Sequence, residues 1–353
     1  MKKIAIIAIL CVLLGLAGAG IGLAVYVANA LKPTEPGDPV RLVIPPGISS
    51  GEIASLLESQ GLIRDAQVFR YYLRYIGEGS RFQAGEYLVT PGTELNQLID
   101  MLNRGLTIPV ETIRFTIPEG FTVLQIAERL DGIPGFDKAE FMELIRSPAE
   151  WSRFEALGSI PDDPNLRYAL EGYLFPETYE LKKGSTTRDI VERMLAELER
   201  KLRTLPPDWK QKLEQTGLSF HQLMTVASLI EREVVLDEER NIVAGVIYNR
   251  LKTGMKLQID ATVQYALDKP KERLFEKDLQ VDSPYNTYRI DGLPPGPIAS
   301  PSLKSILAAL EPAETAYFYY VTKKDGTQGH YFGVTHEDHL RNIRRSNEEV
   351  KAP

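Results

Sequence analysis

The longest apolar stretch of the chain lies near its N-terminus, where residues 4–31 contain no charged side chain. A helix of this length and composition can cross the hydrocarbon core of a bilayer, which is about 30 Å thick. Residues 28–30 form an A-x-A sequence that would also suit a cleaved signal peptide, but the apolar part of a signal peptide is only about 7–15 residues long. The pattern therefore favours an uncleaved transmembrane helix. Lys2 and Lys3 place its N-terminus in the cytoplasm, so we expect a single-pass protein of the cell (inner) membrane.

A repeated pattern of strand, turn and helix follows a Pro-rich spacer at residues 32–40. Three stretches carry it, with turn glycines at Gly47, Gly92 and Gly120. In each copy an apolar residue falls six positions after the glycine and a leucine falls ten positions after it. This spacing puts both side chains on one face of a helix. The first two copies therefore predict a small α+β module at residues 41–106.

The third copy opens the remaining domain, residues 107–350, in which strand and helix patterns mix and predict an α+β fold. The stretch YFYYVTKKDGTQGHYFGV predicts a β-hairpin with Asp325 and Gly326 in its turn. The small module before this domain resembles LysM glycan-binding modules, which implies peptidoglycan as its ligand. The alternative is a strand-turn-helix packing unit without a ligand.

One predicted helix carries two glutamates in the otherwise apolar sequence ASLIEREVV. Ser219 and Gln222 form a capping-box pair, so we expect this helix to begin at Phe220. At about 100° per residue, Glu231 lies about 80° to one side of the buried stripe and Glu233 about 80° to the other. The periodicity does not choose between them, and both are also compatible with solvated carboxylates that flank a core-facing helix.

The composition is that of a folded protein with an acidic balance. Of its 353 residues, 43% are hydrophobic and 25% are charged, which excludes general disorder and allows two domains. The net charge of −7 argues against nucleic acid as a partner. A single cysteine, Cys11, excludes an internal disulfide, and Leu10 before it does not suit a lipoprotein signal.

The sequence gives no support for a metal or a cofactor. None of the four histidines belongs to an H-E-x-x-H pattern, and the HEDH sequence at residues 336–339 is typical of a solvated helix start. There is no Gly-rich phosphate loop. We therefore expect chemistry that depends on side chains alone.

Three long blocks carry the most specific signal. They are LEGYLFPETY at residues 170–179, the stretch that contains ASLIEREVV at residues 223–267, and SPYNTYRIDGLPPGPIASPS at residues 283–302. In this order they resemble the MltG (YceG-like) endolytic peptidoglycan transglycosylase family, and the resemblance covers nearly the whole chain. It implies a membrane-anchored enzyme with a lysozyme-like helical active-site region in its catalytic domain.

The resemblance also implies which side chain is the catalytic acid. In lytic transglycosylases with a lysozyme-like domain, the acid is the glutamate of a helix-borne Glu-Ser pair and follows an apolar residue by four positions. Read on SLIEREV, Leu229 takes the apolar position and Glu233 that of the acid, with Glu231 as the alternative. Val234 stands where the serine would be. Such an acid must be neutral near pH 7, and apolar neighbours such as Ile230 raise a glutamate pKa in that direction.

Candidate substrate-binding residues have amides or flat, polar-edged rings, which suit sugars. Gln258 follows a predicted short strand, LQID, in which Asp260 is expected to cap the next helix. The aromatic residues of the YNTY stretch could instead anchor their loop. The candidates are Gln258, Tyr285, Asn286, Thr287, Tyr288, Asn249, Glu171 and Tyr173.

The implied reaction cleaves the β-1,4 bond between N-acetylmuramic acid and N-acetylglucosamine and leaves a 1,6-anhydro end. The implied partners are peptidoglycan strands, the cytoplasmic membrane and peptidoglycan synthases, with strand elongation ended by the cut. A hydrolytic muramidase is the first alternative and would need a second carboxylate, such as Asp237, Glu238 or Asp260, within about 10 Å of the acid. A non-catalytic peptidoglycan-binding scaffold is the second.

Overall fold

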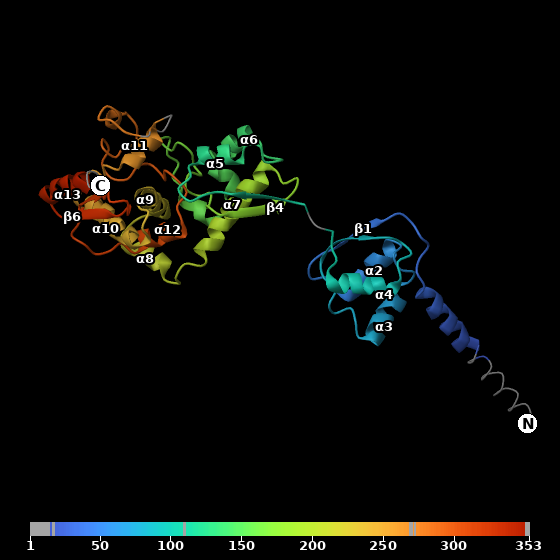
Figure 1. Ribbon diagram of the computed structural model, residues 1–353. Helices are drawn as coiled ribbons and strands as arrows, with labels where there is room; N and C mark the ends of the chain where they lie inside the picture. Colours follow the sequence, from blue (N-terminus) through green and yellow to red (C-terminus); the bar gives the residue numbers. More distant parts are fainter. Residues whose placement is uncertain (1–14, 16–17, 109–110, 268–270, 272, 350–353) are drawn as a thin grey trace, which may run out of the picture. The chain divides into compact units, whose positions relative to one another are not determined.

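The computed structural model describes residues 15, 18–108, 111–267, 271 and 273–349. The chain divides into two compact units between Glu111 and Thr112, each with its own buried cluster of apolar side chains. The two units are coloured from blue to cyan and from green to red in Figure 1.

Unit 1 begins with a helix over residues 18–30. Most of the predicted transmembrane segment, residues 4–14 and 16–17, lies outside the described residues. Within the described part of the chain, no helix combines the length and the apolar character needed to cross a membrane. The hydroxyl of Tyr26, near the end of this helix, donates a hydrogen bond to the Asp65 carboxylate.

The rest of unit 1 is a two-stranded antiparallel sheet with three helices. The elements are β1 (Val40–Ile44), α2 (Ser50–Ser59), α3 (Ala66–Ile76), β2 (Gly85–Val89) and α4 (Leu95–Arg104). Gly47 and Gly92 have φ values of 81° and 90°, which a turn glycine adopts without the Cβ clash of other residues. The repeated leucines, Leu57 and Leu102, are fully buried, so the predicted helix faces are confirmed.

Unit 2 opens with the third copy of the repeat, whose strand pairs with a strand far along the chain. The elements are β3 (Thr112–Thr116), α5 (Val123–Leu130), α6 (Lys138–Leu144), η1 (Pro148–Trp151), η2 (Glu155–Ser159), β4 (Thr178–Lys182) and α7 (Thr187–Leu202). Strands β3 and β4 are antiparallel, with Phe115 opposite Tyr179. The expected core residues of the copy, Ile126 and Leu130, are fully buried.

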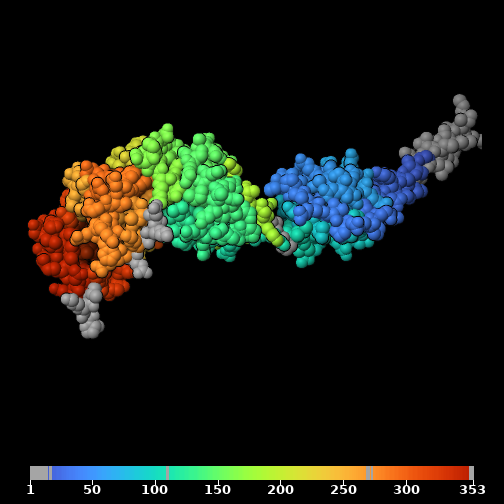
Figure 2. Space-filling model, turned by 90° about the horizontal axis from the view of Figure 1, so that it is seen from above, coloured from blue at the N-terminus to red at the C-terminus, as the bar shows by residue number. Residues whose placement is uncertain are grey.

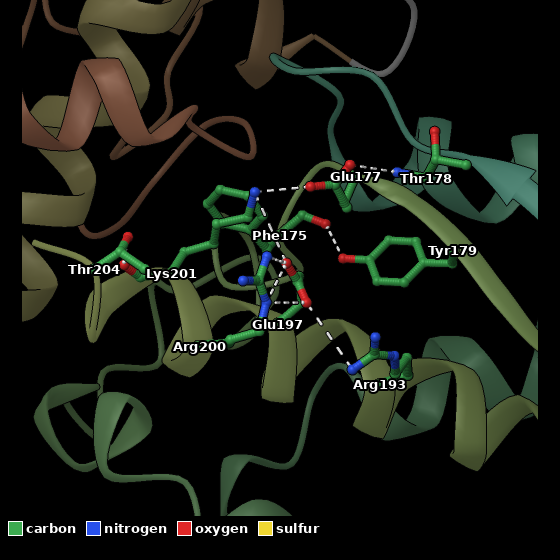
Figure 3. A network of polar contacts seen from close by, with 9 residues as sticks. All are labelled: Phe175, Glu177, Thr178, Tyr179, Arg193, Glu197, Arg200, Lys201 and Thr204. Carbon is green, nitrogen blue, oxygen red and sulfur yellow. Dashed lines mark hydrogen bonds and ion pairs between the residues drawn. The ribbon is translucent and has the colours of Figure 1, made fainter.

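A network of charged side chains on α7 reaches the segment before β4 through Lys201. Glu197 accepts two hydrogen bonds of 3.0 Å from Arg200 Nε, and Lys201 Nζ donates to Glu177 at 2.8 Å (Figure 3). The Tyr179 hydroxyl donates to the Phe175 carbonyl. The contact between Lys201 and Glu177 joins the end of the LEGYLFPETY block to α7.

The C-terminal part of unit 2 is mainly helical. Its elements are α8 (Trp209–Thr216), α9 (Phe220–Glu233), η3 (Asp237–Glu239), α10 (Arg240–Thr253), α11 (Asp260–Ala266), η4 (Asp278–Gln280), α12 (Leu303–Leu310), β5 (Tyr319–Thr322), β6 (His330–Gly333) and α13 (His336–Glu349). Helix α9 lies at the centre, with α10, α11 and α12 packed around it (Figure 1). The predicted hairpin is confirmed as the antiparallel pair β5–β6.

Candidate active site

The two glutamates lie in the last turn of α9, which is the most buried helix of the unit. Its N-terminus carries the predicted capping box between Ser219 and Gln222, and the helix begins at Phe220 as expected. Every side chain from Leu223 to Ile230 is buried. The helix ends at Glu233, because Val234 adopts an extended conformation. Both carboxylates are therefore presented from a fixed scaffold at a helix terminus.

One carboxylate oxygen of Glu231 lies among four hydrogen-bond donors. Its Oε2 accepts from the Ser302 N–H at 2.9 Å, from the Ser302 hydroxyl at 2.6 Å and from the Ser305 hydroxyl at 2.7 Å. Arg240 Nη1 lies 3.4 Å from the same oxygen, and both side chains of this ion pair are less than 10% exposed. All of these partners donate to the same oxygen. Glu231 thus fastens α9 to the start of α12 and has a structural role.

Glu233 has a different environment, with the Tyr320 hydroxyl as its hydrogen-bond donor at 3.0 Å. Burial raises the pKa of Glu233 to about 7, and the nearby negative charge of Asp260 acts in the same direction. The Tyr320 hydrogen bond, Arg232 and Arg250 oppose this rise in the pKa. With this pKa, Glu233 is protonated in a substantial fraction of the molecules near neutral pH. It can donate a proton and take one back.

Asp260 and Tyr288 form the second pair of polar groups near Glu233. The Tyr288 hydroxyl donates to Asp260 Oδ1 at 2.5 Å. The prediction that Asp260 caps α11 is wrong, since Ile259 is the N-cap residue and no side chain caps this helix. Asp260 is the first residue of the helix, exposed to solvent, and its charge acts on Glu233.

Arg250 joins the two sides of the site. Its Nε donates to the Phe318 carbonyl at 2.6 Å, just before β5, and its Nη1 donates to the Leu257 carbonyl at 2.6 Å. The guanidinium also lies over the Tyr319 ring, 5.3 Å from the centroid. The buried arginine therefore holds the hairpin that carries Tyr320 against the loop before Asp260. Figure 2 shows the orange and red parts of unit 2 next to each other on one face.

Gln258 lies in that loop in an unusual backbone conformation. The predicted LQID strand is wrong, because residues 256–259 are not in a strand and Gln258 has a φ of 50°. A left-handed conformation costs a residue with a Cβ roughly 1–2 kcal/mol. Two hydrogen bonds to Thr287 stabilise this backbone conformation. The Thr287 carbonyl accepts from the Gln258 N–H at 3.1 Å, and the Thr287 hydroxyl accepts from the Ile259 N–H at 2.9 Å. The Gln258 side chain is exposed, as a substrate contact requires.

The YNTY stretch divides between scaffold and site. Tyr285, Asn286 and Thr287 are buried and face the interior, so a sugar ring cannot reach them. The Asn286 side-chain amide donates to the carbonyls of Leu279 and Val281, at 2.9 Å and 2.8 Å. Of the four residues, only Tyr288 is partly exposed. The expectation of a substrate contact is therefore wrong for Tyr285, Asn286 and Thr287, and Tyr288 remains the candidate of this stretch.

Three further candidates also have structural roles. Asn249 donates to the carbonyls of Thr315 and Tyr317, at 2.8 Å and 2.9 Å. The Tyr173 hydroxyl lies 2.9 Å from His221 Nδ1 in the core.

Glu171 is fully buried, and burial raises its pKa to about 8 although the Val123 N–H and the Tyr265 hydroxyl both donate to it. Asn249, Tyr173 and Glu171 thus make hydrogen bonds that support the fold.

Sequence reasoning missed Tyr320 and Arg250. The hairpin pattern contains Tyr320 but gives it no role in the site, and the helix pattern around Arg250 is compatible with both a surface and a cleft position. The alternation of a strand does show that Tyr319 and Tyr320 face opposite sides. The local sequence does not show which of the two tyrosines contacts Glu233, because the contact joins residues that are 87 positions apart in the chain.

Comparison with known proteins gives a consistent family assignment. Residues 42–345 match the YceG-like family. An endolytic murein transglycosylase of Bacillus subtilis is 36% identical over 315 residues, which are 86% of this chain and 85% of the relative. A protein of the same name from Streptococcus pneumoniae is 33% identical over 90% of this chain, but this chain spans only 60% of that longer relative.

A solved structure agrees with these sequence matches. The crystal structure of a YceG-like protein from Listeria monocytogenes is similar to this chain with a TM-score of 0.59 and 32% sequence identity. The similarity covers 86% of this chain and 99% of the Listeria chain.

Proposed function

The chain belongs to the YceG-like family, and we propose that it is an endolytic murein transglycosylase with Glu233 as its general acid and base. Its substrate is the β-1,4 bond between N-acetylmuramic acid and N-acetylglucosamine in peptidoglycan strands. The observation that carries the assignment is the contrast between the two glutamates of α9. Glu231 accepts from four donors that fix it in the fold, whereas burial raises the pKa of Glu233 to about 7.

One carboxyl group is enough for the reaction because the substrate supplies the nucleophile. Protonated Glu233 gives its proton to the glycosidic oxygen as the bond from that oxygen to C1 of N-acetylmuramic acid breaks. The resulting Glu233 carboxylate takes the proton of the C6 hydroxyl of the same sugar. The C6 oxygen bonds to C1 and closes a 1,6-anhydro ring. Glu233 is protonated again at the end, and no water is consumed.

The surroundings of Glu233 suit both halves of this cycle. Burial and the charge of Asp260 favour the protonated form that begins the reaction. The Tyr320 hydroxyl donates to one carboxylate oxygen and stabilises the anion that forms after proton transfer. The two opposing influences keep the pKa near the operating pH, where an acid that must later act as a base is most effective.

The test is the product of glycan digestion. Purified protein is incubated with peptidoglycan strands, and the fragments are identified by mass spectrometry. We expect 1,6-anhydro ends from the wild type and intact strands from Glu233→Gln, with the fold unchanged by circular dichroism. Glu128→Gln is the matched control, since Glu128 is an exposed glutamate on α5. Release of anhydro ends by Glu233→Gln at the normal rate would remove Glu233 from this role.

A hydrolytic muramidase is the second candidate, and the position of Asp260 favours it. The charge of Asp260 acts on Glu233, and glycosidases that use water place two carboxyl groups about 5–10 Å apart. Hydrolysis would leave reducing ends and would be abolished by Asp260→Asn. Transglycosylation would continue in that variant, although with a lower pKa at Glu233. Intact strands from the wild-type protein would leave only the scaffold alternative.

We further propose that residues 4–31 anchor the protein in the cytoplasmic membrane with the N-terminus inside. The support is the uncharged apolar run and its two preceding lysines, Lys2 and Lys3. An enzyme in this place, with a LysM-like module at residues 41–106, would meet new strands next to the peptidoglycan synthases and end their elongation. Digestion of both units by protease added outside intact spheroplasts is expected. Protection of both units would contradict this orientation.

A further inference from the structure

Helix α3 of unit 1 has a second face that the module does not use. Its apolar face is buried through Phe69 and Leu73. On the other side, the side chains at positions i, i+3, i+4, i+7 and i+8 are all exposed. These residues are Gln67, Arg70, Tyr71, Arg74 and Tyr75, here called the α3 outer face.

The chemistry of the α3 outer face is aromatic and cationic. Tyr71 is 66% exposed and Tyr75 is 87% exposed, which is unusual for two large rings on one helix. The Arg74 guanidinium lies 5.9 Å from the Tyr71 ring centroid. Neither Arg70 nor Arg74 has an ion-pair partner among the residues that the structure describes, and α3 contains no acidic residue. Tyrosine and arginine together are typical of side chains that lie at a membrane–water interface.

The helix is also fastened to the segment that leads from the N-terminus. Asp65, the N-cap of α3, accepts from the Tyr26 hydroxyl of the helix over residues 18–30. Arg64, one residue earlier, donates to the Pro33 carbonyl at 2.9 Å. Thr34 accepts from the Gly92 N–H at 3.1 Å, so the spacer packs on the module and does not hang free. The module therefore has a fixed orientation on the N-terminal helix.

We propose that the α3 outer face docks on the anionic surface of the lipid bilayer. The arginines bind lipid phosphates, and the tyrosine rings enter the headgroup layer with their hydroxyls toward water. The docking fixes the tilt of unit 1 at the membrane. This inference rests on the proposed membrane anchor and not on the reaction.

The test uses the full chain reconstituted in vesicles. A fluorophore is attached at Gln67→Cys in a Cys11→Ser background, and quenching by a nitroxide on the lipid headgroup reports contact with the surface. We compare phosphatidylcholine vesicles with vesicles that also contain phosphatidylglycerol. Each arginine near an anionic surface contributes about fivefold, so Arg70→Gln/Arg74→Gln is expected to lower the ratio of docked to free module about thirtyfold. The matched control is Arg81→Gln/Arg104→Gln, which removes the same charge from exposed positions outside this face.

Strong quenching in anionic vesicles that is lost in Arg70→Gln/Arg74→Gln and in high salt supports the proposal. Equal quenching in both kinds of vesicle would overturn it, as would an equal loss in the control variant. Displacement of the label from the lipid by soluble glycan fragments would assign the face to glycan instead. Cleavage of soluble strands by Arg70→Gln/Arg74→Gln is expected at the wild-type rate, so failure here is distinguishable from failure of the proposed activity.

Discussion

At the scale of single residues, two neighbouring glutamates on one helix are given opposite properties by their surroundings. Glu231 and Glu233 are separated only by Arg232, which is exposed and donates to the Gly120 carbonyl at 3.1 Å. The difference arises because the two side chains leave the helix on opposite flanks. One flank meets the serines at the start of α12, and the other meets Tyr320 and the loop before α11. The number of hydrogen-bond donors around each carboxylate, and not its position in the sequence, distinguishes the structural Glu231 from the candidate acid Glu233.

The raised pKa of Glu233 predicts a dependence of stability on pH. The folded value of about 7 lies above the ordinary value of 4.5, so folding favours the protonated form. The contribution of Glu233 to the free energy of unfolding is fully present below pH 4.5 and is lost as the pH rises through about 7. Glutamine cannot ionise. Between pH 4.5 and pH values above about 7, the free energy of unfolding of the wild type should therefore fall by about 1–3 kcal/mol relative to that of Glu233→Gln. Urea unfolding at both ends of the interval measures it, and a constant difference between the two proteins would contradict the raised pKa.

Tyr320 predicts a second effect at this scale. Tyr320→Phe removes the hydroxyl that donates to the Glu233 carboxylate, so the pKa of Glu233 should rise further. The loss of activity at alkaline pH should move to higher pH, and the maximal rate should fall about tenfold because the anion loses its donor. The pH–rate profile on soluble strands measures both. Tyr319→Phe, on the opposite side of β5, is the control and should leave the profile in place.

At the scale of elements, α9 is held by polar contacts at both ends and by apolar contacts along its length. At its end, Glu231 and Arg240 are a buried ion pair between α9 and α10, and the same carboxylate binds Ser302 at the start of α12. Three helices therefore meet at one carboxylate. The active-site geometry depends on this junction, because Glu233 follows in the same turn.

Removal of the Glu231 carboxylate should destabilise unit 2 strongly. Glu231→Ala removes the acceptor of the Ser302 and Ser305 hydroxyls and leaves Arg240 with Asp237 as its ion-pair partner, which should cost about 3 kcal/mol. Glu231→Gln keeps the shape and some hydrogen bonds and should cost less. Denaturant unfolding monitored in unit 2 gives both values. A cost below about 1 kcal/mol for Glu231→Ala would mean that the junction is not a structural anchor.

The loop before α11 predicts a separation of stability from activity. Glycine accepts a φ of 50° without strain, so Gln258→Gly should leave the free energy of unfolding unchanged or raise it by up to about 1 kcal/mol. The exposed amide is lost, so turnover of glycan should fall. Gln258→Asn, which tolerates the left-handed region and keeps an amide, is the control. Destabilisation by glycine would show that the side chain serves the fold instead of the substrate.

The elements that depend on local pattern could be predicted from the sequence, whereas the site loops could not. The capping box of α9, the C-cap Gly254 of α10 and the β5–β6 turn are encoded within a few residues of each element. The conformation of Gln258 instead depends on Thr287, far along the chain, and on Arg250. The same reason explains why the burial of Tyr285 was missed: its partner ring, Tyr265, belongs to another element.

At the scale of the whole molecule, the chain has two apolar cores that share no residue. The core of unit 1 is built around Leu57, Phe69 and Leu102, and that of unit 2 around the buried face of α9. The boundary between Glu111 and Thr112 lies just before the strand of the third repeat copy. Repeated strand-turn-helix patterns thus contribute to two separate cores, and similarity of pattern along the sequence does not imply one packed array.

Separate cores predict two unfolding transitions in calorimetry, one for each unit. Leu57→Ala opens a cavity at a fully buried position of unit 1 and should cost about 2–5 kcal/mol in that transition alone. Glu231→Ala should lower only the transition of unit 2, because its partners Ser302, Ser305 and Arg240 all lie there. The pair of variants therefore assigns the transitions without further probes. A single transition that both substitutions lower equally would show that the two units unfold together.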